Sequence, residues 1–359
     1  MNTIPSTFNR DFPAYTVIGG ARRSASTGIC AVLLNRGGRY ARSAFFRELE
    51  SGGFDYVLSM ESGGHFDIEE LSGAFPFVRF VLFKDAPNIG CQINVAAGEA
   101  DTPLFFVLWS DFHPILSLNA ERIVSRLLVK PDGAPQNNAP KNGAPKSPRL
   151  RLCTTPTLQN PRFETLPTAY APVINGKKFD TLPFAPLKEA SPTLYPFDAA
   201  GVYDRERFIN LGGFDPKLNS RHWQLLDFGL RAWLWGEEIR CTQQARFSLY
   251  GGLQPENITA DESYLRFFLK NLAPVIRGGA AAGASGKDGG DAGSKGRRAG
   301  GSAHLPLRRF VPYLLNAGGG ALNAVRDFSE IRGWVDANSR RFVNDINGIT
   351  SFWNRSPSV

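Results

Sequence analysis

Two segments of the sequence bring together residue types that can do chemistry. In the first, Ser110 and Asp111 directly follow the apolar run 103–109, and His113 lies two residues further on. A carboxylate at the end of a buried strand, two residues from an imidazole, can bind a divalent cation such as Mg²⁺ or Mn²⁺. The alternative is structural, with Asp111 capping the next turn and His113 lying in a loop. Local chemistry leaves both interpretations open.

The second segment combines a flexible turn with a helical carboxylate. Gly212 and Gly213 form the turn, and Asp227 lies in the helix predicted to follow it. A carboxylate near the carboxyl edge of a sheet can act as a general base on an acceptor hydroxyl. The competing interpretation is that Asp227 pairs with Arg231 at i,i+4, which supports the helix by a few tenths of a kcal/mol.

The elements that must position these residues alternate along the chain. Continuous apolar runs predict strands buried on both faces, and segments with helical spacing separate them. The predicted strands are 29–35, 54–60, 77–83 and 103–109, and the predicted helices are 40–51, 66–74 and 90–100. This alternation predicts βαβ units with a parallel sheet, an α/β fold. Ligands of such sheets bind at the carboxyl ends of the strands, so we expect Asn35, Glu61 and Asp111 at the site.

The remainder of the chain divides by composition. A helix is expected over 220–235, and residues 131–150 repeat a Gly/Asn-Ala-Pro theme that predicts a flexible surface insertion. We expect a catalytic domain over 1–276, then a disordered Gly/Ala/Ser-rich linker over 277–304, then a C-terminal helical segment over 305–359.

Bulk composition restricts the class of protein. The 359 residues are 42% hydrophobic and 21% charged, which suits a soluble chain with a sizeable core. Four cysteines lie far apart, so they predict buried thiols in a reducing compartment. No signal peptide is recognisable, and the longest uninterrupted apolar run, Leu104–Trp109, is far shorter than the ~20 residues of a membrane helix. We therefore expect a cytoplasmic protein, at most peripheral at the inner face of the membrane.

The net charge of +8 is unevenly distributed. Residues from Arg277 onward carry +6, and the rest of the chain carries +2. A nucleic-acid partner is not expected, because the excess lies in the linker and terminal helices and no recognition motif accompanies it. Three interpretations of the basic tail stay open. It is solvated, it contacts anionic lipid or a charged polymer, or it packs its apolar face on the catalytic domain.

Taken in order, the two segments resemble the family 2 glycosyltransferases with the GT-A fold. In that family an N-x-G…N…A helix precedes a strand ending in D-x-D. A later G-G-F-D segment precedes an E-D pair on a helix, then an Arg and a Gly. The matching residues here are Asn88, Gly90, Asn94, Ala100 and Asp111, and then Gly212, Gly213, Phe214, Asp215, Asp227, Arg231 and Gly236. The resemblance covers residues 28–250 and implies a GT-A fold with a C-terminal helical extension.

The resemblance also implies roles for individual residues. Asp111 would hold a divalent metal on the donor diphosphate, and Asp227 would be the general base. His113 is a candidate for a further metal ligand from its own position, in compensation for the first Asp of D-x-D. The residues implied to lie beside the nucleotide sugar are Asn35, Glu61, Asn88, Asn94, Ser110, Asp111, Gly212 and Gly213. The implied reaction transfers a sugar, with inversion, from a nucleotide-diphosphate donor to a hydroxyl of a glycan, a lipid-linked acceptor or a cell-surface polysaccharide.

Two positions depart from the family pattern. Trp109 stands where the first Asp of D-x-D would be, and Leu226 stands where the Glu of the E-D pair would be. Trp109 removes a metal ligand, and Leu226 removes a family feature beside the implied base. These departures keep open an alternative function: a catalytically weakened or inactive GT-A domain that binds nucleotide sugar or glycan.

Overall fold

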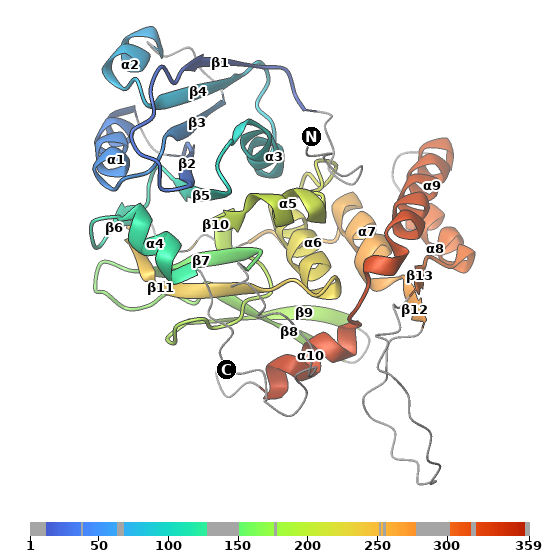
Figure 1. Ribbon diagram of the computed structural model, residues 1–359. Helices are drawn as coiled ribbons and strands as arrows, with labels where there is room; N and C mark the ends of the chain where they lie inside the picture. The colour runs from blue at the N-terminus through green and yellow to red at the C-terminus, as the bar shows by residue number, and fades with distance from the viewer. Residues whose placement is uncertain are drawn as a thin grey trace, which may run out of the picture.

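A mixed β-sheet flanked by helices organises the chain in the computed structural model (Figure 1). The structure describes residues 12–36, 39–62, 68–127, 151–175, 178–250, 253, 256–277, 302–316 and 321–355. Within these ranges the main sheet has nine strands in the order β1-β4-β3-β2-β5-β10-β7-β11-β6. The predicted α/β class is confirmed. The predicted insertion, 131–150, lies outside the described residues.

The N-terminal half of the sheet is parallel, as the apolar runs predict. Its strands are β2 (Ile29–Leu34), β3 (Val57–Ser62), β4 (Val78–Phe83) and β5 (Leu104–Trp109). Helices α1 (Arg39–Ser51), α2 (Ile68–Ala74) and α3 (Ile89–Glu99) connect them. Every residue of β2 and β5 is buried, which explains why these strands are apolar throughout. The antiparallel edge strand β1 (Tyr15–Gly19), paired with β4, was not predicted.

The second half of the sheet is mixed. Strand β10 (Gly201–Asp204) runs antiparallel between β5 and β7 (Cys153–Gln159), and β11 (Ile239–Ser248) continues parallel to β7. The short β6 (His113–Pro114) closes the edge, and β8 (Ala169–Asn175) pairs with β9 (Lys178–Phe184) in a separate ribbon. The helices of this half are α4 (Ala120–Leu127), α5 (Arg205–Leu211) and α6 (Arg221–Leu234), the last as predicted.

The ends of the predicted linker are ordered strands, which corrects its boundaries. After α7 (Glu262–Phe267) and a π-helical turn (Phe268–Leu272), β12 (Val275–Arg277) pairs antiparallel with β13 (Ser302–His304). Ala303 in β13 is 1% exposed, so burial of this side chain opposes a linker there. The intervening residues, 278–301, lie outside the described part of the chain.

The C-terminal segment contains three helices and packs back on the sheet domain. It contains α8 (Phe310–Asn316), α9 (Ala321–Ala337) and α10 (Ile346–Arg355), and Figure 1 shows α9 beside α7. The backbone N–H groups of Val343 and Asn344 donate to the carbonyl of Leu234 at 2.9 and 3.0 Å. The rings of Trp353 and Trp233 lie 4.6 Å apart. The two predicted domains therefore share one hydrophobic core.

Membrane-spanning helices and disulfides are both missing from the described ranges. No helix there is long and apolar enough to cross a bilayer. The four cysteines are free thiols, and three of them, Cys30, Cys153 and Cys241, are buried. Burial raises the pKa of the Cys30 thiol to about 11 and that of Cys241 to about 12. Both thiols are therefore protonated and unreactive at neutral pH.

Candidate functional site

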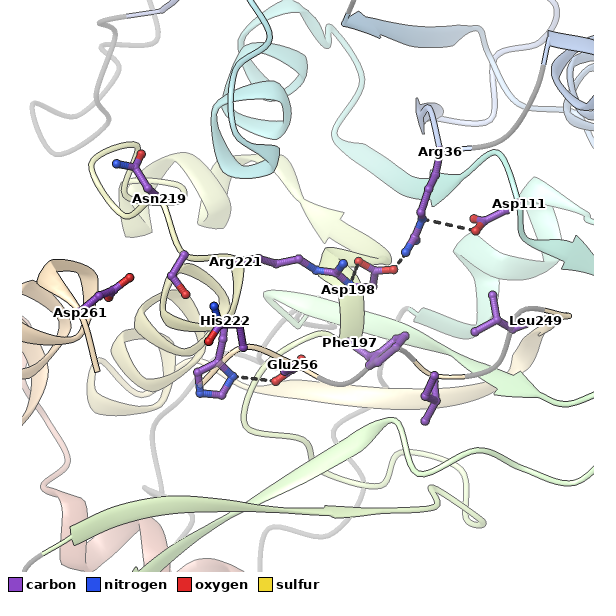
Figure 2. Close-up of a pocket in the computed structure, with 13 residues that line it drawn as sticks. Arg36, Asp111, Phe197, Asp198, Asn219, Arg221, His222, Leu249, Glu256 and Asp261 are labelled. Atoms are coloured by element: carbon purple, nitrogen blue, oxygen red, sulfur yellow. Dashed lines mark hydrogen bonds and ion pairs between the residues drawn. The ribbon is translucent and has the colours of Figure 1, made fainter. Parts of the chain in front are cut away.

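A pocket of about 630 Å³ lies where β2 and β5 end and α6 begins (Figure 2). Its polar lining comes from segments far apart in the sequence. Arg36 follows β2, Asp111 follows β5, and Asp198 precedes β10. Arg221 and His222 form the first turn of α6, and Glu256 lies between β11 and α7. The carboxyl ends of β2 and β5 thus meet the N-terminus of α6, as expected for a ligand site on a parallel sheet.

Arg36 is the centre of the charged network in this pocket. Its guanidinium forms an ion pair with Asp198, and its Nε lies 3.3 Å from an Asp111 oxygen. The guanidinium also stacks over the indole of Trp109, 3.9 Å from the ring centroid. The Arg36 backbone N–H donates to the Ser110 hydroxyl at 3.0 Å. Trp109, which replaces the first Asp of D-x-D, therefore orients a cation at the strand end.

Asp198 is held in a strained conformation between two arginines. Its backbone has φ 55° and ψ 24°, a left-handed conformation that costs a non-glycine residue about 1–3 kcal/mol. Figure 2 shows Arg36 and Arg221 reaching its carboxylate from opposite sides, and both form ion pairs with it. The Trp109 indole N–H donates to the Asp198 carbonyl at 2.9 Å. Burial raises the pKa of Asp198 above its usual value, although the two arginines oppose that effect.

A second polar pair lies at the other end of the pocket. Nδ1 of His222 is 2.6 Å from Oε2 of Glu256, and the Tyr195 hydroxyl donates to the same oxygen at 3.2 Å. Tyr195 itself stacks on Tyr170 at 4.3 Å between centroids. The imidazole and the carboxylate are thus fixed by buried aromatic side chains. Sequence reasoning missed Asp198, Arg221, His222 and Glu256, because no local motif marks them.

Some of the residues expected from the sequence lie at or beside this pocket. Asp111 lines it, and Ser110 receives the Arg36 N–H. The Asn35 amide donates to the Met60 carbonyl at 2.9 Å, so it joins the ends of β2 and β3. His113 is exposed on β6, lies edge-on to Tyr250 at 4.8 Å, and does not line the pocket. The expectation that His113 assists Asp111 as a metal ligand therefore does not fit this geometry.

Glu61 lies at the end of β3, but both of its carboxylate oxygens bond to buried groups of the protein itself. One carboxylate oxygen is paired with Arg42 of α1, and the other accepts a hydrogen bond from the Ser59 hydroxyl at 2.7 Å. The residue is 5% exposed and does not line the pocket. In the structure Glu61 neutralises a buried arginine, so the expected contact with a nucleotide is not supported.

The asparagines and glycines of the motif join α3 to the turn before α6. Asn94 donates to the carbonyl of Phe214 at 2.8 Å and accepts its N–H at 2.9 Å. Asn88 caps α3 and donates to the Pro216 carbonyl at 2.9 Å. Gly212 and Gly213 have φ of 96° and 66°, which suits glycine. Because the polar groups of Asn88 and Asn94 bond to the protein itself, these motif residues build the scaffold and do not line the pocket.

Asp227 does not lie in the pocket either. Its carboxylate is fully buried and is bound by Arg231 at 2.9 Å, Lys270 at 3.0 Å and Asn271 at 2.7 Å. Burial opposes its ionisation, but the charges of Lys270 and Arg231 outweigh burial and lower the pKa of Asp227. A carboxylate with no accessible surface cannot take a proton from an acceptor. The geometry is that of a structural residue that neutralises Arg231 and Lys270 in the core, and it does not fit the expected general base.

A divalent cation fits the pocket through a single protein ligand. The described residues contain no group of three or more His, Cys, Asp or Glu side chains that could hold a metal. However, Oδ1 of Asp111 is buried without a hydrogen-bond partner in the described part of the chain. The pocket also contains the carboxylates of Asp111, Asp198, Glu256 and Asp261 against the two guanidiniums of Arg36 and Arg221. This acidic excess suits a cation that arrives with an anionic ligand, held by Asp111 and by that ligand.

The known proteins to which this chain is similar come from solved structures. No protein-family model matches the sequence, and no curated protein matches it. The structure of GalNAc-T7 with UDP, GalNAc and Mn²⁺ aligns at TM-score 0.45 and 13% identity, covering 67% of this chain and 49% of that one. This chain thus spans about half the length of the GalNAc-T7 structure.

Two further structures align over more of the chain. TarS 1–349 from S. aureus gives TM-score 0.41 and 12% identity over 87% of this chain and 72% of that one. The mannosyltransferase PcManGT from Pyrobaculum calidifontis, in complex with GDP-Man and Mn²⁺, aligns at TM-score 0.42 and 8% identity. The alignment covers 89% of this chain and 73% of that one.

Proposed function

We propose that this protein is a glycosyltransferase that moves a sugar from a nucleotide-diphosphate donor to a hydroxyl acceptor, with inversion. The observation that carries the proposal is the charged chain Asp111–Arg36–Asp198–Arg221 inside the pocket at the carboxyl ends of β2 and β5. The resemblance to the family 2 glycosyltransferases in motif order supports the same reaction class.

Different residues of the charged chain are suited to bind different parts of the donor. Guanidinium groups present planar forks of N–H donors that match phosphate oxygens, so Arg36 and Arg221 are suited to a diphosphate. Asp198, fixed by its backbone and by Trp109, is suited to accept hydrogen bonds from sugar hydroxyls. Asn35 and Ser110, at the ends of β2 and β5, would lie beside the nucleotide.

A divalent cation is part of the proposal through Asp111 alone. Such an ion would offset the negative charge of the departing diphosphate. We expect Asp111→Asn to abolish the metal-dependent part of nucleotide-sugar binding. Equal donor affinity of the wild type in Mn²⁺ and in excess EDTA would show that the two arginines suffice without a metal.

The acceptor is proposed to be a glycan or a lipid-linked sugar, reached at the inner face of a membrane in the cytoplasm. Leu307, Val311 and Leu315 are spaced four residues apart before and along α8, and they are 62%, 60% and 81% exposed. Arg308 and Arg309 are exposed beside them. An apolar helix face flanked by arginines suits an anionic lipid surface.

The experiment that tests the proposed function is a donor screen by calorimetry, followed by an assay of donor hydrolysis. The panel contains UDP-, GDP-, CDP- and dTDP-linked sugars with Mn²⁺. We expect Arg36→Ala to lose binding and Arg36→Lys to keep part of it, because lysine keeps the charge but not the fork. Arg332→Ala is the control, since Arg332 is an exposed arginine on α9 whose Nε lies 4.0 Å from Asp336.

Three outcomes separate the functions. Binding with slow hydrolysis to free sugar and nucleoside diphosphate supports a transferase. Binding of a donor or glycan with no turnover under any condition supports the alternative, an inactive GT-A domain, which Trp109 and Leu226 favour. Binding of no member of the panel contradicts the proposed function altogether.

A further inference from the structure

We propose that His222, held by Glu256, is the base that takes the proton from the acceptor hydroxyl. The inference rests on the proposed function and assigns a role that Asp227 cannot perform from its buried position. Both His222 and Glu256 line the pocket, in which the charged chain also lies. No sequence motif marks either residue, and they lie 34 positions apart.

The geometry of the pair fixes which nitrogen is available. Nδ1 of His222 lies 2.6 Å from Oε2 of Glu256, a distance typical of a charge-assisted hydrogen bond. When Nδ1 carries the proton and donates it to Glu256, the lone pair is on Nε2. Within the described part of the chain, no hydrogen bond occupies Nε2 of His222. This nitrogen is therefore the proton acceptor that the pair provides.

The surroundings hold the imidazole in place. The ring lies edge-on to Trp223 at 4.7 Å and edge-on to Tyr195 at 6.4 Å between centroids. The Tyr195 hydroxyl donates to the same Glu256 oxygen that binds His222. The side chain of His222 is 6% exposed, and that of Glu256 is 21% exposed. A general base must be positioned in this way, because proton transfer requires a fixed donor–acceptor distance.

The other carboxylates of the pocket are already committed. Asp198 is paired with both Arg36 and Arg221, and Asp111 is paired with Arg36. Asp261 caps α7 by accepting the N–H of Tyr264 at 3.2 Å. Protonating any of these carboxylates would weaken an ion pair or a helix cap, and Oδ1 of Asp111, unpartnered among the described residues, is the oxygen proposed for the cation. Nε2 of His222 can accept a proton without losing a hydrogen bond to any described residue.

The step balances without a further reactant. The acceptor oxygen forms its bond to the anomeric carbon as the bond from that carbon to the diphosphate oxygen breaks. The bonding pair leaves with the nucleoside diphosphate, and the acceptor proton moves to Nε2 of His222. The resulting imidazolium is stabilised by the Glu256 carboxylate and returns its proton to solvent after the product leaves.

Azide separates a base from a binding residue. Azide is an anion, so it attacks the anomeric carbon without losing a proton and needs no base. The probe is the best-binding donor of the panel, assayed with water, with an alcohol and with azide as acceptor. We expect His222→Gln to lose hydrolysis and alcohol transfer by a factor on the order of 10²–10⁴. Formation of the inverted glycosyl azide should stay near the wild-type rate.

Glu256→Gln provides a second test if the histidine variant folds poorly. Glu256 is a positioning residue, so its amide variant should lower kcat for alcohol transfer with little change in KM for the donor, while azide transfer is unchanged. Glu121→Gln, an exposed glutamate in α4, is the matched control and should change none of these rates.

The outcomes are distinct from failure of the proposed function. If the wild type neither binds nor hydrolyses any donor, the proposed function fails and His222 has no reaction to serve. If the wild type turns over and either folded variant loses azide transfer as much as alcohol transfer, the pair serves binding or structure, and the inference is overturned. Unchanged alcohol transfer in His222→Gln overturns it equally.

Discussion

Substituting Asp227 by asparagine should destabilise the protein strongly, and this outcome distinguishes a structural aspartate from a catalytic one. The carboxylate is fully buried and bound by the side chains of Arg231, Lys270 and Asn271. The amide has almost the same volume, but it removes the negative charge. Its own N–H group would also face the N–H groups that now donate to the carboxylate. Lys270 would keep its ion pair with Asp215, at 2.8 Å, and Arg231 would keep its hydrogen bonds to two backbone carbonyls, but both cations would lose the negative charge of Asp227.

The expected size follows from the cost of leaving buried charge unpaired. Removing one partner of a buried ion pair costs about 3–5 kcal/mol. The entropy of unfolding is about 2.1 cal/mol/K per residue, so in a chain of 359 residues 1 kcal/mol lowers Tm by roughly 1.3 °C and the loss here should be about 4–7 °C. Asp336→Asn is the control, because Asp336 forms an i,i+4 pair with Arg332 on an exposed helix surface. Such a surface pair contributes about 0–1 kcal/mol.

The pH dependence has a definite sign. Although burial opposes ionisation, Lys270 and the arginines lower the pKa of both Asp215 and Asp227. In acid the unfolded chain therefore binds more protons than the folded chain. The stabilisation is present above the unfolded pKa of about 3.9 and is lost as pH decreases through the lower folded values. Asp227→Asn should make the acid limb of the stability curve shallower.

The assay is circular dichroism during thermal and urea unfolding, at pH 7 and across the acid range, with donor hydrolysis measured on the same samples. A variant that melts within about 2 °C of the wild type but loses turnover by a factor on the order of 10² would refute the structural assignment. That result would restore Asp227 as the general base.

Four further predictions concern packing and the β12–β13 hairpin. Gly229→Ala should give little soluble protein, because its Cβ would lie 2.2 Å from the Leu194 carbonyl oxygen; a soluble yield equal to the wild type contradicts this close approach of α6. Trp353→Ala should lower the unfolding free energy by about 3–5 kcal/mol, measured in urea, because the ring is 2% exposed and packs on Trp233. Replacing residues 278–301 by Asn-Gly, which suits a two-residue hairpin turn, should leave Tm within about 2 °C in calorimetry, since β12 and β13 stay paired. Deleting 277–303 instead should lower Tm, because it removes Ala303 from the core.

The parallel half of the sheet could be predicted from the sequence because its signal is local. Strands buried on both faces are apolar throughout, as in β2 and β5, and helices with periodic apolar residues separate them. Strand β1 was missed because none of its residues is fully buried, which gives a weak pattern. The insertion of β10 between β5 and β7 could not be predicted either, since periodicity does not encode which strands pair.

The site was predicted only where a strand end defines it. Asp111 follows the apolar run of β5, so its place at the sheet edge could be inferred. Asp198 could not, because its partner Arg36 is 162 positions away and its left-handed backbone has no sequence signal. Asp227 was misassigned because an aspartate on a helix gives the same pattern whether it faces a pocket or a buried lysine.

The position of β10 also has a consequence for synthesis of the chain on the ribosome. Strand β5, whose sequence is LFFVLW, pairs with β2 on one side as soon as both have emerged. Its other neighbour is residues 201–204, almost a hundred positions later. At about 5–20 residues per second, that edge waits on the order of 5–20 s for its partner. During this interval six apolar residues present free backbone N–H and carbonyl groups to any other nascent strand. Slowing translation after residue 109 should therefore increase aggregation, whereas a chaperone that covers exposed strand edges should raise the yield of folded protein.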